Sequence, residues 1–234
     1  NFFRTGVNTI NSVSLSTGTS KNQTYVSVSA TNSTGILPNN KYERYNVSGR
    51  NTASFLNDKL TLDFGANLIF QNDRNMTAQG RYFNPLTSLY LFPRAENFDA
   101  VRMYERYNEG LGIYEQYWPY ETQSMELQNP YWTMNRIIRE NKKKRFMTNA
   151  SLKWNIIEGI DITGRLKYDK TDMRSTDKRY ASTIEQFASA YGGYYDIRKE
   201  YSSFYGDIML NIAKTFKDNT WSVNANIGAS INDR

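Results

Sequence analysis

The chain has 234 residues, of which 22% are charged, and its formal net charge is +6. It contains no cysteine and no histidine, which excludes disulfide scaffolds, zinc–thiolate sites, cysteine nucleophiles and Ser-His-Asp catalysis. The mean hydropathy of −0.70 excludes a helical membrane protein. It does not exclude a membrane β-barrel, in which only alternate residues face lipid.

Residues 60–70 alternate strictly between apolar and polar side chains, with Ile69 as the one exception. Successive side chains of a strand point to opposite faces, so this stretch predicts a strand with one apolar and one polar face. Its length matches the roughly 9–11 residues of a membrane-crossing strand rather than the roughly 5–6 of a typical soluble strand. This segment favours an outer-membrane β-barrel.

The same alternation predicts about eight strands along the chain, at residues 12–17, 23–31, 42–54, 60–70, 146–154, 160–168, 202–213 and 220–231. Short turns at 18–22, 57–58, 157–159 and 217–219 alternate with long connections at 32–41, 72–144 and 171–201. Outer-membrane barrels have short periplasmic turns and longer extracellular loops. The predicted fold is all-β: an antiparallel section of a transmembrane β-barrel with long extracellular loops.

Aromatic residues lie where the predicted strands end, as in the girdles at the two membrane interfaces. They are Phe55, Phe70, Trp154, Tyr168, Phe216 and Trp221. The alternative is that they form the core of a soluble sandwich. The opposite face should line the lumen of a wide barrel that holds water or a plug. Its polar residues are Asp63, Asn67, Asp161, Arg165, Lys167, Asp169, Asp207 and Asn211.

The connection at 72–144 is too long for a passive connector and is rich in aromatic residues. We expect it to be ordered, either against a partner or ligand or as a self-packed loop core. Within it, residues 97–107 predict a short helix with Asn97 as the N-cap. The basic run Lys142–Lys143–Lys144–Arg145 is interpreted as a solvated loop or barrel rim. The second long connection, 171–201, should carry strand extensions at both ends.

The chain resembles SusC/RagA-type TonB-dependent transporters over essentially its whole length. The segments that carry the resemblance are 2–6, 12–16, 25–29, 35–36, 44–45, 55–60, 78–86, 91–94, 129–132, 135–142 and 178–182. The resemblance is distributed over these segments rather than concentrated in one motif. The opening Asn1–Phe2–Phe3 without a start methionine, and an end just after a strand pattern, lead us to expect a piece of a longer protein.

The resemblance implies a Bacteroidetes outer-membrane importer with a plugged barrel of about 22 strands. Such a transporter takes up oligosaccharides or peptides with a SusD-like surface lipoprotein as its lid, and TonB acts through parts absent from these residues. The chain would be an internal section of the single barrel domain, without an enzymatic role, a cofactor, a metal or a nucleic-acid partner. A soluble β-rich carbohydrate- or peptide-binding module and a passive porin remain the alternatives.

Aromatic side chains at expected extracellular positions are the candidate contacts with the lid or the substrate. They are Tyr82, Tyr90, Phe92, Tyr117, Trp118, Trp132, Tyr194 and Tyr195. Without histidine, a nucleophile motif or metal-ligand spacing, no catalytic residue is predicted.

Overall fold

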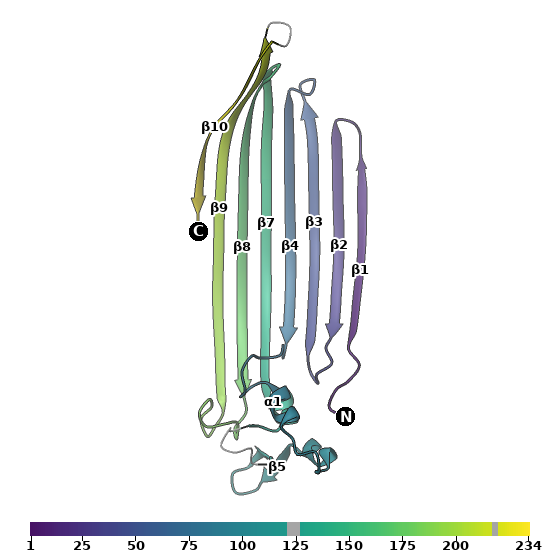
Figure 1. Ribbon diagram of the computed structural model, residues 1–234, viewed down its shortest axis with the longest axis vertical. Coiled ribbons are helices and arrows are strands. Elements are labelled where there is room, and N and C mark those ends of the chain that lie inside the picture. The colour runs from purple at the N-terminus through teal and green to yellow at the C-terminus, as the bar shows by residue number, and fades with distance from the viewer. Residues whose placement is uncertain (121–126, 217–219) are drawn as a thin grey trace.

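The computed structural model describes residues 1–120, 127–216 and 220–234. Eight strands form one sheet in the order β1-β2-β3-β4-β7-β8-β9-β10, and all neighbouring strands are antiparallel (Figure 1). These strands are β1 (Val7–Gly18), β2 (Asn22–Thr34), β3 (Lys41–Phe55), β4 (Leu60–Arg74), β7 (Ile137–Ile157), β8 (Ile160–Arg179), β9 (Gly193–Phe216) and β10 (Trp221–Asp233). The prediction of eight antiparallel strands is confirmed. Within the described residues the sheet is open, with β1 and β10 at its edges.

The strands are longer than the hydropathy pattern predicts, and the long connections are correspondingly shorter. β4 continues to Arg74 and β7 begins at Ile137, so the first long connection is 75–136 rather than 72–144. β8 continues to Arg179 and β9 begins at Gly193, so the expected strand extensions at both ends of 171–201 are confirmed and the connection itself is 180–192. Next to the two long connections, most side chains on both faces of the sheet are polar. The two-residue hydropathy period therefore stops before the backbone pairing does.

One face of the sheet, here called the apolar face, carries most of the hydrophobic residues of the strands, whereas Ile10 and Ile69 lie on the other face. Across β4 and β7 the register opposes Leu62 to Leu152 and Leu68 to Phe146. Many of these side chains are exposed to a large extent, including Val13 at 78% on the outermost strand. A soluble monomer rarely exposes a continuous apolar surface of this kind, whereas the outer wall of a membrane barrel does.

The opposite face, here called the polar face, is held by ion pairs between neighbouring strands. Arg50 Nε lies 2.8 Å from Asp63 Oδ2, and Arg165 Nε lies 2.9 Å from Asp207 Oδ1. Arg145 pairs with Asp169 in the same way. The register places all eight polar residues predicted for the lumen on this one face.

The basic run 142–145 lies in strand β7, on the loop-region side of Phe146, so its interpretation as a loop is wrong, while its interpretation as part of a barrel rim stays a prediction. Strand alternation sends Lys143 and Arg145 to the polar face, while Lys142 and Lys144 point to the apolar face. A run of four cations fits a strand here because each face receives only two of them.

The short turns lie together at one end of the sheet, opposite the long connections (Figure 1). In the β3–β4 turn Leu56, Asn57 and Asp58 all have positive φ values, of 53°, 53° and 63°. Asn and Asp tolerate this left-handed conformation better than most residues. In the β7–β8 turn a Cβ on Gly159 would lie 2.3 Å from the Ala213 carbonyl oxygen, so this position requires glycine. The predicted turn at 217–219 lies outside the described residues.

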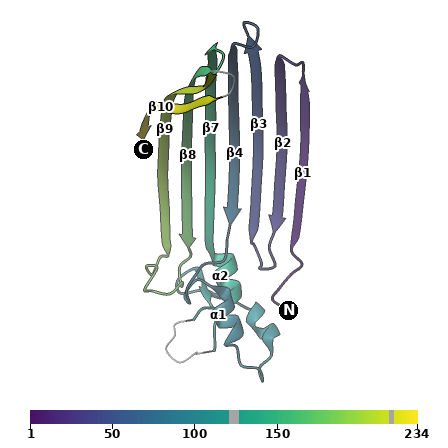
Figure 2. The ribbon, with the colours of Figure 1, turned by 45° about the horizontal axis from the view of Figure 1, so that its top comes forward.

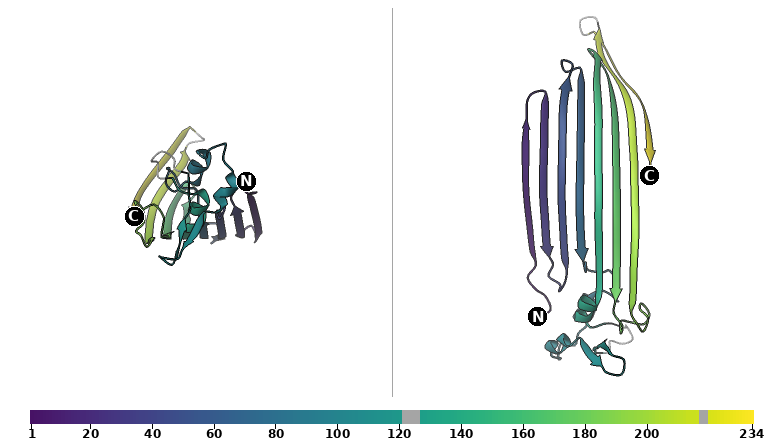
Figure 3. Two further views of the ribbon diagram at one scale, coloured as in Figure 1. Left: turned by 90° about the horizontal axis from the view of Figure 1, so that it is seen from below. Right: turned by 180° about the vertical axis from the view of Figure 1, so that it is seen from behind.

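The long connections carry small elements: helix α1 (Pro85–Tyr90), 3₁₀ helix η1 (Phe98–Arg102), strands β5 (Glu105–Asn108) and β6 (Ile113–Gln116), and helix α2 (Pro130–Arg136). They gather below one end of the sheet (Figure 2). The sheet is curved when viewed along its strands (Figure 3). Asn97 caps a helix as predicted, since its side chain accepts from the Asp99 N–H, but that helix ends at Arg102 instead of residue 107. Among the described residues, no helix is both long and apolar enough to cross a membrane.

Candidate ligand- and partner-binding site

The two long connections form one packed unit, here called the loop region (residues 75–120, 127–136 and 180–192). The Gln116 N–H donates to the Ser182 hydroxyl at 2.9 Å, and the Gln116 side-chain amide donates to the Ser182 carbonyl at 3.2 Å. The Gln128 side chain joins three segments, because it donates to the Tyr82 carbonyl at 2.9 Å and accepts from the Ile184 N–H at 3.4 Å. These bonds fix the second connection against the first.

Trp132 forms the centre of this unit. It is 0% exposed, and its indole N–H donates to the Thr183 hydroxyl at 3.2 Å. A fully buried indole with a satisfied N–H is a packing residue. The prediction of Trp132 as a contact residue is therefore wrong for this structure.

Asn129 holds the start of α2 in place through hydrogen bonds from its side chain and its backbone N–H. Its side-chain amide donates to the carbonyls of Val101 and Tyr117, at 2.8 and 3.1 Å, and its side-chain oxygen accepts from the Tyr131 N–H at 2.8 Å. Its backbone N–H donates to the Gln116 side chain at 2.8 Å. Asn129 is only 1% exposed, and Pro130 follows it in the first turn, where its missing N–H costs nothing.

Two asparagines attach α2 to the sheet. Asn75, directly after β4, donates to the Met134 carbonyl at 3.0 Å and accepts from the Arg139 N–H at 2.9 Å. Asn39, in the β2–β3 connection, donates to the same carbonyl at 3.1 Å and to the Asn135 side chain at 2.7 Å. Both asparagines adopt positive φ values, which this residue type tolerates. The loop region is thus fixed to the end of the sheet.

Cation–π contacts cover the junction between the loop region and the polar face. The guanidinium groups of Arg139 and Arg179 lie 4.5 and 4.7 Å from the centre of the Phe83 ring, and Arg179 also lies 4.6 Å from the Tyr195 ring. Asp177 accepts from Arg179 at 2.7 Å. Arg139, Asp177, Arg179 and Tyr195 share the polar face. The loop region therefore extends over the side of the sheet that carries the ion pairs.

An ion pair between Arg136 and Glu105 lies inside the loop region. Arg136 forms a two-point ion pair with Glu105, which raises the pKa of the guanidinium above its usual value. Burial, and then the charge of Glu105, raise the pKa of the neighbouring Tyr104 hydroxyl. Tyr104 accordingly stays neutral and Arg136 stays charged around neutral pH.

The other seven predicted contact residues lie in three environments: aromatic packing, a cation–π contact, and exposed surface. Phe92 and Trp118 are half-buried in an aromatic cluster, with ring centres 6.5 Å apart, and Tyr120 packs edge-on against both. Tyr82 packs on Phe187 at 4.7 Å.

Tyr117 lies under the Arg106 guanidinium at 3.5 Å. Tyr90 is 76% exposed. Tyr194 and Tyr195 are both exposed, but they occupy opposite faces of β9, so they cannot form one contact surface.

The structure also exposes aromatic residues that were not predicted as contacts. Tyr191 is 96% exposed, next to Gly192 in the second connection. Tyr107 and Tyr114 pack against each other across the β5–β6 hairpin and remain more than half exposed, with Leu111 at its tip. Gly110 and Gly112 flank that tip and are the sequence signal that could have marked it as a projecting turn.

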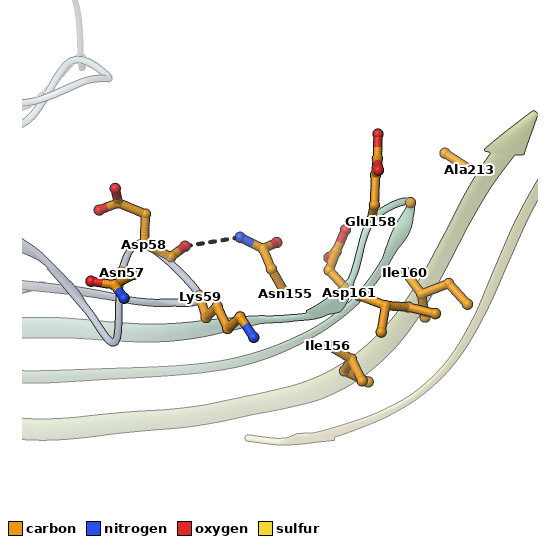
Figure 4. Close-up of a pocket in the computed structure, with 11 residues that line it drawn as sticks. Asn57, Asp58, Lys59, Asn155, Ile156, Glu158, Ile160, Asp161 and Ala213 are labelled. Carbon is orange, nitrogen blue, oxygen red and sulfur yellow. Dashed lines mark hydrogen bonds between the residues drawn. The ribbon is translucent and has the colours of Figure 1, made fainter.

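At the opposite end of the sheet, an open depression lies between two short turns (Figure 4). Its walls come from the β3–β4 and β7–β8 turns, and the Asn155 amide joins them by donating to the Asp58 carbonyl at 3.1 Å. Among the described residues, no group of three histidine, cysteine, aspartate or glutamate side chains could hold a metal ion, here or elsewhere.

No family model and no curated protein matches the chain. Solved structures do match it. A structure of the RagAB peptide transporter aligns over 96% of this chain with a TM-score of 0.69 at 15% identity. The RagAB peptide importer aligns over 92% in its closed-closed state, with a TM-score of 0.63 at 14% identity, and over 98% in its open-open state, with a TM-score of 0.54 at 13% identity.

The chain has the fold of a section of an antiparallel β-barrel. It spans about a quarter of the length of the matched chains, with covered shares of 25%, 23% and 29%. At 13–15% sequence identity, these matches establish similarity of fold only. The structural match nevertheless extends through the strands and the loop region together, because nearly the whole chain is aligned.

Proposed function

We propose that the chain is part of an outer-membrane importer that is driven by TonB and takes up oligosaccharides or peptides together with a SusD-like surface lipoprotein. The observation that best supports this proposal is the alignment of 96% of the chain with a quarter of a RagAB peptide transporter chain. That match concerns the fold, so substrate, energy source and partner belong to the proposal.

The two faces of the sheet fit a membrane barrel better than a soluble binding module. The apolar face would contact lipid and the polar face, with its cross-strand ion pairs, would line the lumen. A soluble module would have to cover the exposed apolar face, which no described residue does.

The loop region is the proposed extracellular contact surface. Its exposed aromatic side chains, such as Tyr90, Tyr107 and Tyr191, are available for stacking on sugar rings or packing on a peptide or a lid. Its core of Trp132 and Asn129 would hold them in place. Substrate would be captured between the lid and these side chains, and released to the periplasm when TonB rearranges the plug.

The proposal is tested by uptake of labelled oligosaccharides and peptides in cells that carry or lack the full-length protein. We expect uptake of one of the two classes to require the protein and to stop when a protonophore collapses the inner-membrane gradient. We also expect a surface lipoprotein to co-purify with the protein. Uptake that survives the protonophore, without a co-purifying lipoprotein, would instead support a passive porin.

A further inference from the structure

The apolar face ends toward the loop region in an aromatic boundary. On β4, β7, β8 and β9 this boundary consists of Phe70, Phe146, Tyr168 and Phe204, and the rings of Phe146 and Tyr168 lie 6.4 Å apart. Aromatic residues of this kind mark the level of the lipid headgroups. The residues next to this boundary on the same face are therefore placed to meet headgroups.

Five cationic side chains lie beyond this aromatic boundary on the apolar face, on the side of the loop region. Lys144 lies two positions from Phe146, and Lys170 lies two positions from Tyr168, so each is the next side chain on its strand and face. One step further out, the register places Lys142, Arg174 and Arg198 directly side by side on β7, β8 and β9. Like charges directly opposite each other on a sheet are destabilising, so this row needs compensation.

The carboxylates of the described residues compensate only part of this charge. Asp196 binds Arg174 at 2.7 Å and lies 3.8 Å from Arg198, and Glu200 binds Lys170. No described carboxylate lies within ion-pair distance of Lys142 or Lys144, and both lysines are exposed. The two lysines line a shallow depression together with Arg174, Arg198, Asp172 and Glu200.

We propose that this cationic surface, consisting of Lys142, Lys144, Arg174 and Arg198, binds the phosphate of an anionic lipid headgroup. The proposal rests on the membrane location in the proposed function. A lipid fits better than a free phosphate because the cations continue directly into the apolar face. Acyl chains would lie on Phe146 and Tyr168 while the phosphate meets the cations.

The test is titration of the detergent-purified full-length protein with phosphatidic acid, read by native mass spectrometry. The variant combines Lys142→Gln, Lys144→Gln and Arg198→Gln, and leaves the Arg174–Asp196 pair intact. We expect the affinity for phosphatidic acid to fall about a hundredfold, since each basic residue near an anionic lipid surface contributes a factor of about five. Phosphatidylcholine should bind weakly to both proteins.

The matched control combines Lys143→Gln, Lys153→Gln and Lys167→Gln, three lysines of β7 and β8 that lie on the polar face. It removes the same charge and should leave phosphatidic acid binding unchanged. An equal loss in the control, or equal binding of phosphatidylcholine, overturns the proposal. Competition by inorganic phosphate at the concentration of the lipid would show an anion site without lipid selectivity and also overturns it.

Uptake assays on the same variants separate this proposal from the proposed function. Uptake that persists while phosphatidic acid binding is equal in the variant and the unmodified protein defeats only the lipid site. Selective phosphatidic acid binding by a protein that transports neither substrate class defeats only the import function.

Discussion

Arg136, at the end of α2, and Glu105, at the start of β5, form a two-point ion pair with N–O distances of 2.6 and 2.8 Å. Their side chains are only 25% and 20% exposed, and the Arg136 guanidinium also lies 4.9 Å from the Tyr180 ring. This geometry joins three segments of the loop region, one of them from the second connection. The pair is therefore expected to stabilise the loop region rather than the sheet.

Glu105→Gln should destabilise the loop region by about 1–2 kcal/mol, because it leaves the Arg136 charge half-buried and uncompensated. Hydrogen exchange of residues 98–116 should accelerate, while exchange in β7 and β8 should stay unchanged. Asp99→Asn is the control, because its ion pair with Arg102 is well exposed and contributes little. If residues 98–116 exchange hydrogen equally slowly in Glu105→Gln and in the unmodified protein, the structural role of the pair is contradicted.

Trp132→Ala should unfold the loop region locally at a cost of about 3–5 kcal/mol, because it removes the largest fully buried side chain. Trp118→Ala should leave hydrogen exchange in the loop region nearly unchanged and weaken lid or substrate binding, because Trp118 is only half-buried. Hydrogen exchange and binding measured on the two single variants therefore distinguish a core residue, Trp132, from a residue that contacts the lid or the substrate, Trp118. If Trp118→Ala also abolished protection across the loop region, Trp118 would be a core residue too.

Tyr90→Ala and Tyr191→Ala should keep the fold intact, because both side chains are largely exposed. If either residue is a contact hot spot, its removal should lower the affinity for the lid or the substrate about tenfold. Tyr25→Ala is the control, since Tyr25 lies on the polar face near the short turns. Binding of the lid and of each substrate class by the detergent-purified full-length protein would be measured. Unchanged binding in both variants would remove these tyrosines from the contact surface.

Ala150→Arg should destabilise the barrel by about 2–4 kcal/mol if the apolar face contacts lipid, because Ala150 lies midway between the aromatic residues Phe146 and Trp154 and the new charge would lie in hydrocarbon. Ser151→Arg, the neighbouring residue on the polar face, should be tolerated because Arg165 and Asp63 already lie beside it there. The free energy of unfolding of both variants would be measured with urea in lipid bilayers. A similar decrease in this free energy for the two variants would mean that both faces have the same environment, which would argue against a membrane barrel.

The strands could be predicted where the two faces differ in polarity. Residues 60–70 and 146–154 alternate because one side chain faces an apolar surrounding and the next a polar one. Beyond Phe70 and Phe146 most side chains on both faces are polar, so hydropathy no longer indicates the strand, and β4 and β7 continue further than predicted. The basic run 142–145 belongs to a strand rather than a loop for the same reason.

The contact residues could be predicted only as a class. Aromatic composition indicated an ordered loop, but it did not distinguish Trp132, which is buried, from Tyr191, which is 96% exposed. That difference depends on segments distant in sequence, such as the Thr183 hydroxyl that accepts from Trp132. Likewise, only the strand pairing showed that Tyr194 and Tyr195 face opposite sides.

The sequence by itself determined the all-β class, the apolar and polar faces and the alternation of short and long connections, because these follow from local side-chain periodicity and turn-forming residues. Only the tertiary structure decided which loop aromatics are core, how the two long connections pack together, and that Lys142, Arg174 and Arg198 lie side by side. These relationships join residues far apart in the chain. They are set by hydrogen-bond register and by the burial that distant segments provide to one another.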